Sequence, residues 1–402
     1  MNSPAILYFI RGEADLERIS SIAIPGKAYA KQYFAYYGDI DLLFHFGIKN
    51  KFQKELLRMN DFEVLDVITL SVYGKLYRWI RSLETNLSFM KLFYRLIQKV
   101  FNRFFHNYQN KNKLAEKVLK KIKPNILITD NSVERENYFP HLLRQAAIKK
   151  NIKIHVTGHG PAGGLHKEYH EYNMTPPDKF QGCVVGICSK HDIGFGLPNR
   201  VVTGDPADGF PHLIFKHEQT NNDIDFLNKR KYKIGFFMSA PFETCTNSWA
   251  IMEDIMLDCS FRDDIAMAAK FHPRLYKLGD YRYLKKIDNL KLFGPELDRT
   301  KLIKWADIVV CSDHCSMLFE GMIFQKKVVA VHSKKVRPFA KFKSKIHGCD
   351  ISMNSIHNAN EFNLDKLKKY TSDTKFIDEF CWGGLGKADL GELIIKDMIS
   401  ID

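Results

Sequence analysis

Three basic residues stand within five positions in the stretch KFHPR, residues 270–274. Arg274 keeps its charge at physiological pH and presents a planar fork of donors that matches phosphate oxygens. His272 can donate a hydrogen bond to an oxyanion or deliver a proton, and Lys270 adds positive potential. Because Pro273 restricts the backbone around it, it fixes the direction of its neighbours. The pattern predicts a clamp for a phosphodiester or diphosphate; the alternative is a surface turn with incidental cations.

A second candidate phosphate site lies in ADIVVCSDHCSMLFEGM, residues 306–322. An apolar strand ends near Cys311 and a helix begins near Ser316, and the free N–H groups at a helix start attract phosphate. Ser312 and Ser316 are therefore predicted to bind donor phosphate, although Ser316 is equally explained as a helix N-cap. Glu320 is predicted either to bind ribose hydroxyls or to be a simple first-turn carboxylate. The stretch lacks the GxGxxG spacing, which disfavours NAD.

A glycine-rich turn, TGHGPAGG at residues 157–164, follows another strand-like run. Glycines let the backbone approach a ligand closely, because they carry no side chain. His159 lies between two of them and is a candidate general base for an acceptor hydroxyl. The alternative is a glycine-rich turn with an incidental histidine. The other candidate residues of the turn are Gly158, Gly160, Pro161, Gly163 and Gly164.

Carboxylates also stand at the ends of predicted strands. Asp130 ends PNILITD, residues 124–130, and is predicted either to orient His159 or to replace it as the base. Asp205 and Asp208 lie in TGDPADGF, residues 203–210, where they are predicted to be polar residues of a hinge at the edge of a cleft.

The elements around these motifs alternate between strand and helix. PNILITD, the helix-like YFPHLLRQAAIKKN (138–151) and IKIHVTGHG (152–160) form one series, and a second starts at YKIGFFMSA (232–240). The run DDIAMAAK before KFHPR is helix-like in composition. Motifs at strand ends are typical of doubly wound α/β sheets. The sequence therefore predicts two Rossmann-like domains facing a cleft, the GT-B arrangement.

The domain boundaries are predicted from the amino-acid composition along the chain. A polar linker at 216–231 separates an N-terminal acceptor-side domain, 1–215, from a C-terminal nucleotide-donor domain, 232–402, whose terminal helices are expected to pack back on the first. The N-terminal domain contains a basic, amphipathic helical insertion at 74–123. In it Lys91, Arg95, Lys99 and Arg103 recur every four residues. This stripe indicates either a solvated helix face or contact with an anionic membrane surface.

The net charge of +14 and the pI near 9.2 favour an anionic partner. Nucleic acid is not expected, since the sequence has no helix-turn-helix, RNP-like or zinc-finger pattern. No window has the ~18 apolar residues of a membrane-spanning helix, and the eight cysteines are expected to be free thiols. A cytoplasmic protein is predicted, with possible contact to the inner face of the membrane.

The motifs resemble the cytidine-nucleotide-dependent transferases of bacterial surface polysaccharides. The resemblance spans about residues 124–335, from ILITDNS through TGHGP, GICSKHD, VVTGDPADG and KFHPR to ADIVVCSDHCSMLFEGMIFQKKVVAV. The group includes CDP-glycerol glycerophosphotransferases of teichoic acid synthesis, capsule transferases, and CMP-Kdo and CMP-sialic acid transferases. By motif position, the resemblance implies that His159 is the base, that His272 and Arg274 hold donor phosphate, and that Ser312 and Ser316 complete the nucleotide site.

The resemblance thus implies a glycosyltransferase of lipopolysaccharide or capsule synthesis, without metal or cofactor, that uses a CMP- or CDP-linked donor and a glycan or lipid-linked glycan acceptor. The Gly-Pro of the turn resembles Kdo transferases, and GDPADG lacks the Pro-Arg pair of glycerophosphotransferases, so a CMP-linked acidic sugar such as Kdo is the leading donor. Such a donor needs a carboxylate, for which Asp130, Glu168 and Glu243 are candidates. The alternatives are a CDP-glycerol-type glycerophosphotransferase and a GT-B nucleotide-sugar 2-epimerase.

Overall fold

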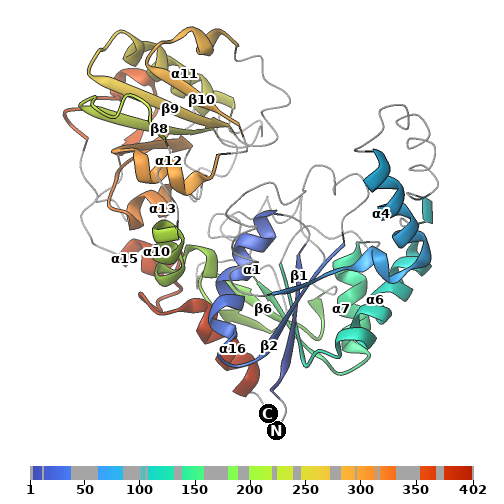
Figure 1. Ribbon diagram of the computed structural model, residues 1–402. Coiled ribbons are helices and arrows are strands. Elements are labelled where there is room, and N and C mark those ends of the chain that lie inside the picture. The colour runs from blue at the N-terminus through green and yellow to red at the C-terminus, as the bar shows by residue number, and fades with distance from the viewer. Residues whose placement is uncertain are drawn as a thin grey trace.

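The computed structural model of the chain consists of two parallel sheets with helices packed against them (Figure 1). It describes residues 3–10, 13–37, 62–84, 101, 103–104, 107–130, 138–157, 180–188, 199–219, 224–238, 246–271, 282–294, 297–312, 315, 317–331, 354–367 and 375–400. The two sheets confirm the predicted α/β architecture with two doubly wound domains.

The N-terminal sheet has the strand order β3-β2-β1-β4-β5-β6-β7, and every neighbouring pair is parallel. Its strands are β1 (Ala5–Ile10), β2 (Lys31–Tyr36), β3 (Glu63–Asp66), β4 (Ile126–Asp130), β5 (Lys153–Thr157), β6 (Val184–Ile187) and β7 (Arg200–Val202). The order reverses between β1 and β4. In doubly wound sheets, ligands bind outside the carboxyl ends of the strands at such a point.

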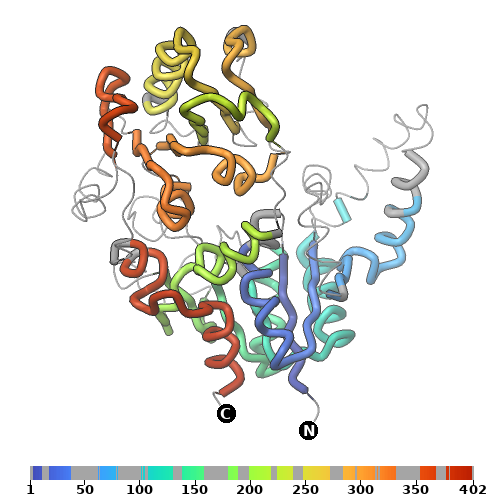
Figure 2. The backbone as a smooth tube through the Cα atoms, turned by 60° about the vertical axis from the view of Figure 1, so that its left-hand side comes forward, coloured from blue at the N-terminus to red at the C-terminus, as the bar shows by residue number. Residues whose placement is uncertain are grey.

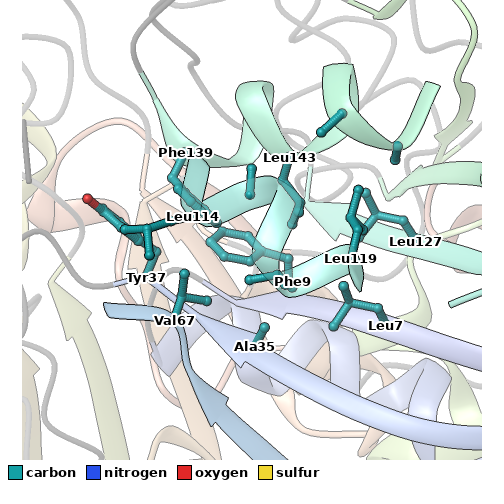
Figure 3. Close-up of a cluster of buried hydrophobic side chains, with 14 of the residues drawn as sticks. Leu7, Phe9, Ala35, Tyr37, Val67, Leu114, Leu119, Leu127, Phe139 and Leu143 are labelled. Carbon is teal, nitrogen blue, oxygen red and sulfur yellow. The ribbon is translucent and has the colours of Figure 1, made fainter. Parts of the chain in front are cut away.

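Strand β1 is apolar throughout because helices cover both faces of its sheet. Leu7 and Phe9 pack toward α6 (Tyr108–Ile122) and α7 (Phe139–Ile148), as Figure 3 shows. Ile6 and Tyr8 instead join the core beneath α1 (Glu13–Gly26) and α16 (Leu390–Ser400). Since alternate residues of a strand point to opposite faces, burial on both sides requires a continuous apolar run.

The second sheet has the order β10-β9-β8-β11-β12-β13 and is also parallel throughout. Its strands are β8 (Tyr232–Met238), β9 (Ile265–Phe271), β10 (Leu290–Phe293), β11 (Ile308–Ser312), β12 (Lys327–Val331) and β13 (Asn354–Ile356). The buried side chains of α11 (Thr246–Ser260) form the core on one face, and those of α12 (Arg299–Trp305) and α13 (Met317–Ile323) form it on the other.

The structure corrects one local prediction. The run DDIAMAAK, helix-like in composition, ends in strand β9 rather than in a helix. β9 lies between β8 and β10, and Ile265, Met267 and Ala269 are completely buried. Alanine has a strong helix propensity, but its small side chain also suits a strand that is packed on both faces. Tertiary burial therefore overrides the local propensity.

The C-terminal helix α16 packs on the N-terminal domain, beside α1, in both views (Figures 1 and 2). A Cβ on Gly391 would lie 2.1 Å from the carbonyl oxygen of Ser21, so only glycine permits this approach of the two helices. The remaining elements are the helices α4 (Val72–Glu84), α10 (Phe210–Gln219) and α15 (Lys375–Phe380), and the 3-10 turns η1 (Val67–Leu70), η5 (Pro206–Asp208), η6 (Arg282–Lys286) and η7 (Ala359–Glu361).

Candidate functional site

Several of the predicted residues lie at the carboxyl ends of neighbouring strands. Asp130 is the last residue of β4, next to the switch point of the first sheet. Ser312 is the last residue of β11, which pairs with β8 at the corresponding switch point of the second sheet. Lys270 is the penultimate residue of β9 on the other side of β8. Two sheet edges of this kind are where an α/β protein presents groups to a ligand.

Lys270 is half-buried and its ammonium group donates a hydrogen bond of 3.3 Å to the backbone carbonyl of Gly294, just after β10. This contact holds the long side chain along the sheet edge. His272 and Arg274, the other two members of the predicted clamp, lie outside the described residues. Phosphate binding by the KFHPR stretch therefore stays a prediction.

Ser312 presents a polar group without a described partner. Its side chain is completely buried, and its hydroxyl makes no hydrogen bond to any residue that the structure describes. Its backbone carbonyl accepts a hydrogen bond of 3.0 Å from the N–H of Cys315, which turns the chain toward α13. Because buried hydroxyls are normally hydrogen-bonded, the Ser312 hydroxyl is available as a donor to a bound group.

Glu320 is fully buried on α13 and held by the first turn of α12. Its Oε2 lies 3.2 Å from Nε of Arg299, and its Oε1 accepts a hydrogen bond of 3.2 Å from the hydroxyl of Thr300. Asp298 caps α12 and so fixes the position of both partners, by accepting a hydrogen bond of 2.7 Å from the N–H of Thr300. A buried carboxylate needs such partners to remain charged. Its predicted contact with ribose stays a prediction.

Sequence reasoning missed Arg299 and Thr300. The only signal was that both residues directly follow Asp298, and an aspartate commonly caps the start of a helix. Nothing in the spacing relates them to Glu320, which lies twenty positions after Thr300 in the chain.

Of the two carboxylates predicted to belong to a hinge, Asp208 lies within electrostatic reach of Arg299 and Glu320. Asp205 and Asp208 are buried around η5, and Nε of Arg18 on α1 lies 3.8 Å from Oδ1 of Asp205. Burial and the neighbouring charge of Asp205 raise the pKa of Asp208 well above its usual value, against the opposing effect of Arg299. The charge on Glu320 raises this pKa further. Ionisable side chains from both domains thus influence one another around η5.

The other predicted site residues are not described by the structure. They are His159, Ser316, Glu168, Glu243 and the turn residues Gly158, Gly160, Pro161, Gly163 and Gly164; of Asp130, only the backbone is described. Among the described residues, no group of three His, Cys, Asp or Glu side chains is placed to hold a metal ion. Within the same residues, no helix is both long enough and apolar enough to cross a membrane.

Comparison with known proteins identifies the fold. No protein-family model matches the sequence, and neither does any curated protein. Solved structures do match. The chain has a GT-B-like fold. The UDP-GlcNAc 2-epimerase of Methanocaldococcus jannaschii matches with a TM-score of 0.59 and 13% identity, covering 98% of this chain and 99% of that one.

Two further epimerases match the GT-B-like fold over its whole length. The UDP-N-acetylglucosamine 2-epimerase of Rickettsia bellii has a TM-score of 0.57 and 12% identity, with 100% of this chain and 97% of that one covered. The UDP-GlcNAc 2-epimerase of Neisseria meningitidis, bound to UDP-GlcNAc, has a TM-score of 0.57 and 11% identity, with 98% and 99% covered.

These matches overturn the prediction of a glycosyltransferase, because all three of these proteins, which match along the whole chain, are epimerases. The motifs did not separate the two classes of enzyme. Both must hold the phosphates of a nucleotide, and cations and a helix start do so equally well in either. The more specific expectations of a CMP-linked donor and of Kdo find no support either, since the matching enzymes are named for UDP-GlcNAc.

Proposed function

We propose that the protein is a nucleotide-sugar 2-epimerase acting on a UDP-linked 2-acetamido sugar. The observation that carries the proposal is the extent of the structural match. Each of the three epimerases is covered over at least 97% of its length, including both sheets and the C-terminal helix that returns to the first domain. The place in surface-polysaccharide synthesis predicted from the sequence fits this activity, since an epimerase supplies activated sugars to such synthesis.

The C-terminal domain is assigned to the nucleotide. The Ser312 hydroxyl, without a described partner at the end of β11, and the ammonium group of Lys270 at the end of β9 are suitable donors for phosphate oxygens. His272 and Arg274 follow Lys270 by two and four residues and extend the same cationic stretch. Cations at the diphosphate stabilise the charge that develops there if the bond between the sugar and the nucleotide weakens.

The N-terminal domain is assigned to the chemistry at carbon 2. Inverting this carbon breaks its C–H bond and remakes it on the opposite face of the sugar, so the reaction needs a base and an acid. Asp130 ends β4 at the switch point, and His159 follows β5, the next strand of the sheet. We assign proton transfer to these two residues, with Glu243, which follows β8 by five residues in the sequence, as a further candidate.

The test is incubation of the full-length protein with UDP-GlcNAc in D2O, followed by proton NMR. We expect a second anomeric signal from the 2-epimer and loss of the carbon-2 proton signal in both epimers, because the removed proton exchanges with solvent. UDP-GlcNAc that remains unchanged, although UDP raises the unfolding temperature, would show nucleotide binding without epimerisation and contradict the proposal. Stabilisation by CMP but not by UDP would contradict the choice of uridine.

A further inference from the structure

Helix α4 exposes a stripe of large apolar side chains. Val72 is 81% exposed, Leu76 43% and Trp79 60%. At about 100° per residue, positions 72, 76 and 79 fall within a narrow arc of the helix surface. Tyr73 lies about 100° around the helix from Val72 and is 56% exposed. Figures 1 and 2 both show α4 on the outer flank of the N-terminal domain, away from the second sheet.

Packing on the other side of α4 prevents the stripe from turning inward. Tyr77 is completely buried, and its ring lies 5.2 Å from that of Phe101. Gly74 is also buried, and a Cβ there would lie 1.8 Å from the carbonyl oxygen of Ile68. The Tyr73 ring packs at 4.6 Å from Phe104. The helix is thus seated on its Gly74–Tyr77 side, and this orientation leaves Val72, Leu76 and Trp79 facing outward.

The same region accounts for most of the protein's net positive charge. Residues 72–123 contain thirteen Lys and Arg against two Glu, a net charge of +11 out of the +14 of the whole chain. Lys75 is exposed on α4 beside the apolar stripe, and Lys113, Lys117, Lys120 and Lys121 are exposed on α6. The Lys117 ammonium group donates a hydrogen bond of 3.3 Å to the carbonyl of Leu70, at the base of α4, so the basic and apolar surfaces adjoin.

We propose that the exposed face of α4 docks on an anionic lipid surface. Leu76 and Trp79 enter the headgroup region, where amphipathic indole rings are favoured, and Lys75 with the exposed lysines of α6 lies against the lipid phosphates. Each basic residue near such a surface contributes about 1 kcal/mol. A second copy of this chain is a poorer occupant, because it would bring an equal positive charge to the same face.

Tryptophan fluorescence gives a local readout of this docking. The chain has four tryptophans, and Trp249, Trp305 and Trp382 are all buried. A change in emission on adding vesicles therefore reports mainly on Trp79. With vesicles of phosphatidylcholine and phosphatidylglycerol at 7:3, we expect a blue shift and quenching by brominated lipid. With phosphatidylcholine alone, or in 0.5 M NaCl, we expect neither, because the attraction is electrostatic.

Vesicle co-sedimentation of variants completes the test. Leu76→Glu should bind anionic vesicles at least tenfold more weakly at an unchanged unfolding temperature. Phe261→Glu is the matched control, since Phe261 is 88% exposed but follows α11 on the other domain; its binding should equal that of the wild type. Trp79→Phe should sediment normally and lose the emission change.

Two results would overturn the proposal. One is wild-type protein that sediments no better with anionic than with neutral vesicles. The other is a wild-type dimer that binds no vesicles and that Leu76→Glu converts to a monomer, because the stripe would then be an interface between copies of the chain. Size-exclusion chromatography with light scattering distinguishes the two.

Discussion

The indole N–H of Trp382 donates a hydrogen bond of 2.9 Å to the backbone carbonyl of Asp208. Close by, the N–H of Asp205 donates to the carbonyl of Cys381. The C-terminal segment is therefore attached to η5, where the chain leaves the first sheet for α10. Because Cys381 and Trp382 lie between α15 and α16, these two contacts connect the C-terminal helices to η5.

This attachment depends on Gly383. Its φ is +64°, and a Cβ there would lie 2.5 Å from Cγ1 of Val202. Gly383→Ala should therefore lower the free energy of unfolding by about 3 kcal/mol, from backbone strain and from the clash. Gly386→Ala is the control: it has the same φ of +64° but no described atom within 4 Å, and should cost about 1 kcal/mol. Urea unfolding measures both, and equal losses would contradict the close approach.

His155 on β5 should make stability depend on pH. Burial lowers the pKa of His155 from 6.5 to about 4, and neither ring nitrogen bonds to a described residue. Between these values the unfolded chain binds a proton that the folded chain excludes. The contribution of neutral His155 to the free energy of unfolding is therefore fully present above about pH 6.5. It falls as the pH drops toward 4, by about 2 kcal/mol between pH 7 and pH 5.

His155→Leu should remove this part of the pH dependence. The measurement is the unfolding free energy of both proteins at pH 7 and pH 5, and the loss between the two pH values should be about 2 kcal/mol smaller in the variant. Because other groups titrate equally in both proteins, they cancel in the comparison. The same loss in both would mean that His155 is protonated in the fold.

Some strands of the fold can be recognised from the sequence and others cannot. AILYFI is recognisable as β1 because burial on both faces makes the whole run apolar. IAMAAKF is not recognisable as β9, because alanine and methionine fit a helix as well, and only the neighbouring strands β8 and β10 decide. Strand β2, KQYFAY, was not predicted, since its polar first residues hide its pattern.

For the candidate site, the sequence shows which residues follow strands but not which of them meet. The position of Ser312 at the end of a strand was predicted in this way. The pairing of Glu320 with Arg299 was not, because it depends on how α12 and α13 pack on one face of the sheet. The approach of Arg18 to Asp205 spans most of the first domain and leaves no local signal at all.

Asp208→Asn should stabilise the protein at neutral pH. Burial, followed by the charge of Asp205, raises the pKa of Asp208, so the folded protein favours the neutral acid. The stabilisation that this protonation contributes is fully present below 3.8, the pKa in the unfolded chain. It is lost as the pH rises through the pKa in the folded protein. Asparagine is neutral at every pH. The unfolding temperature of Asp208→Asn should exceed that of the wild type at pH 7.5, and the two should converge near pH 4.

The control for this variant is Asp254→Asn, on the exposed side of α11. It should leave the unfolding temperature within about 1 °C of the wild type at both pH values, as surface substitutions normally do. If Asp208→Asn is destabilising at pH 7.5, the carboxylate is charged and its attraction to Arg18 or Arg299 stabilises η5.

Removing Arg299 should destabilise the second domain. Arg299→Ala leaves the fully buried Glu320 carboxylate without its cation, which costs about 3 kcal/mol. Arg299→Ala with Glu320→Gln should recover most of that loss, because no buried charge remains. The control is Arg262→Ala, which breaks an exposed pair of 2.9 Å with Asp264 and should cost below about 1 kcal/mol. Similar losses for Arg299→Ala and Arg262→Ala would mean that Glu320 is solvated.

The histidines of the proposed site should separate binding from turnover. His272→Ala removes a charge-assisted contact to the diphosphate and should weaken UDP binding about 10- to 100-fold in calorimetry. His159→Ala should bind UDP within about twofold of the wild type and lose at least about 100-fold in epimerisation, the usual contribution of a general base.

His357→Ala is the matched control for both histidine variants, because His357 also follows a strand of the second sheet, but the outermost one, β13. It should change neither UDP affinity nor turnover. Unchanged UDP affinity in His272→Ala would remove the KFHPR stretch from the phosphate site without touching the epimerase proposal, which depends on the exchange at carbon 2. Full turnover in His159→Ala would instead leave Asp130 or Glu243 as the base, and the same NMR assay on Asp130→Asn and Glu243→Gln would decide between them.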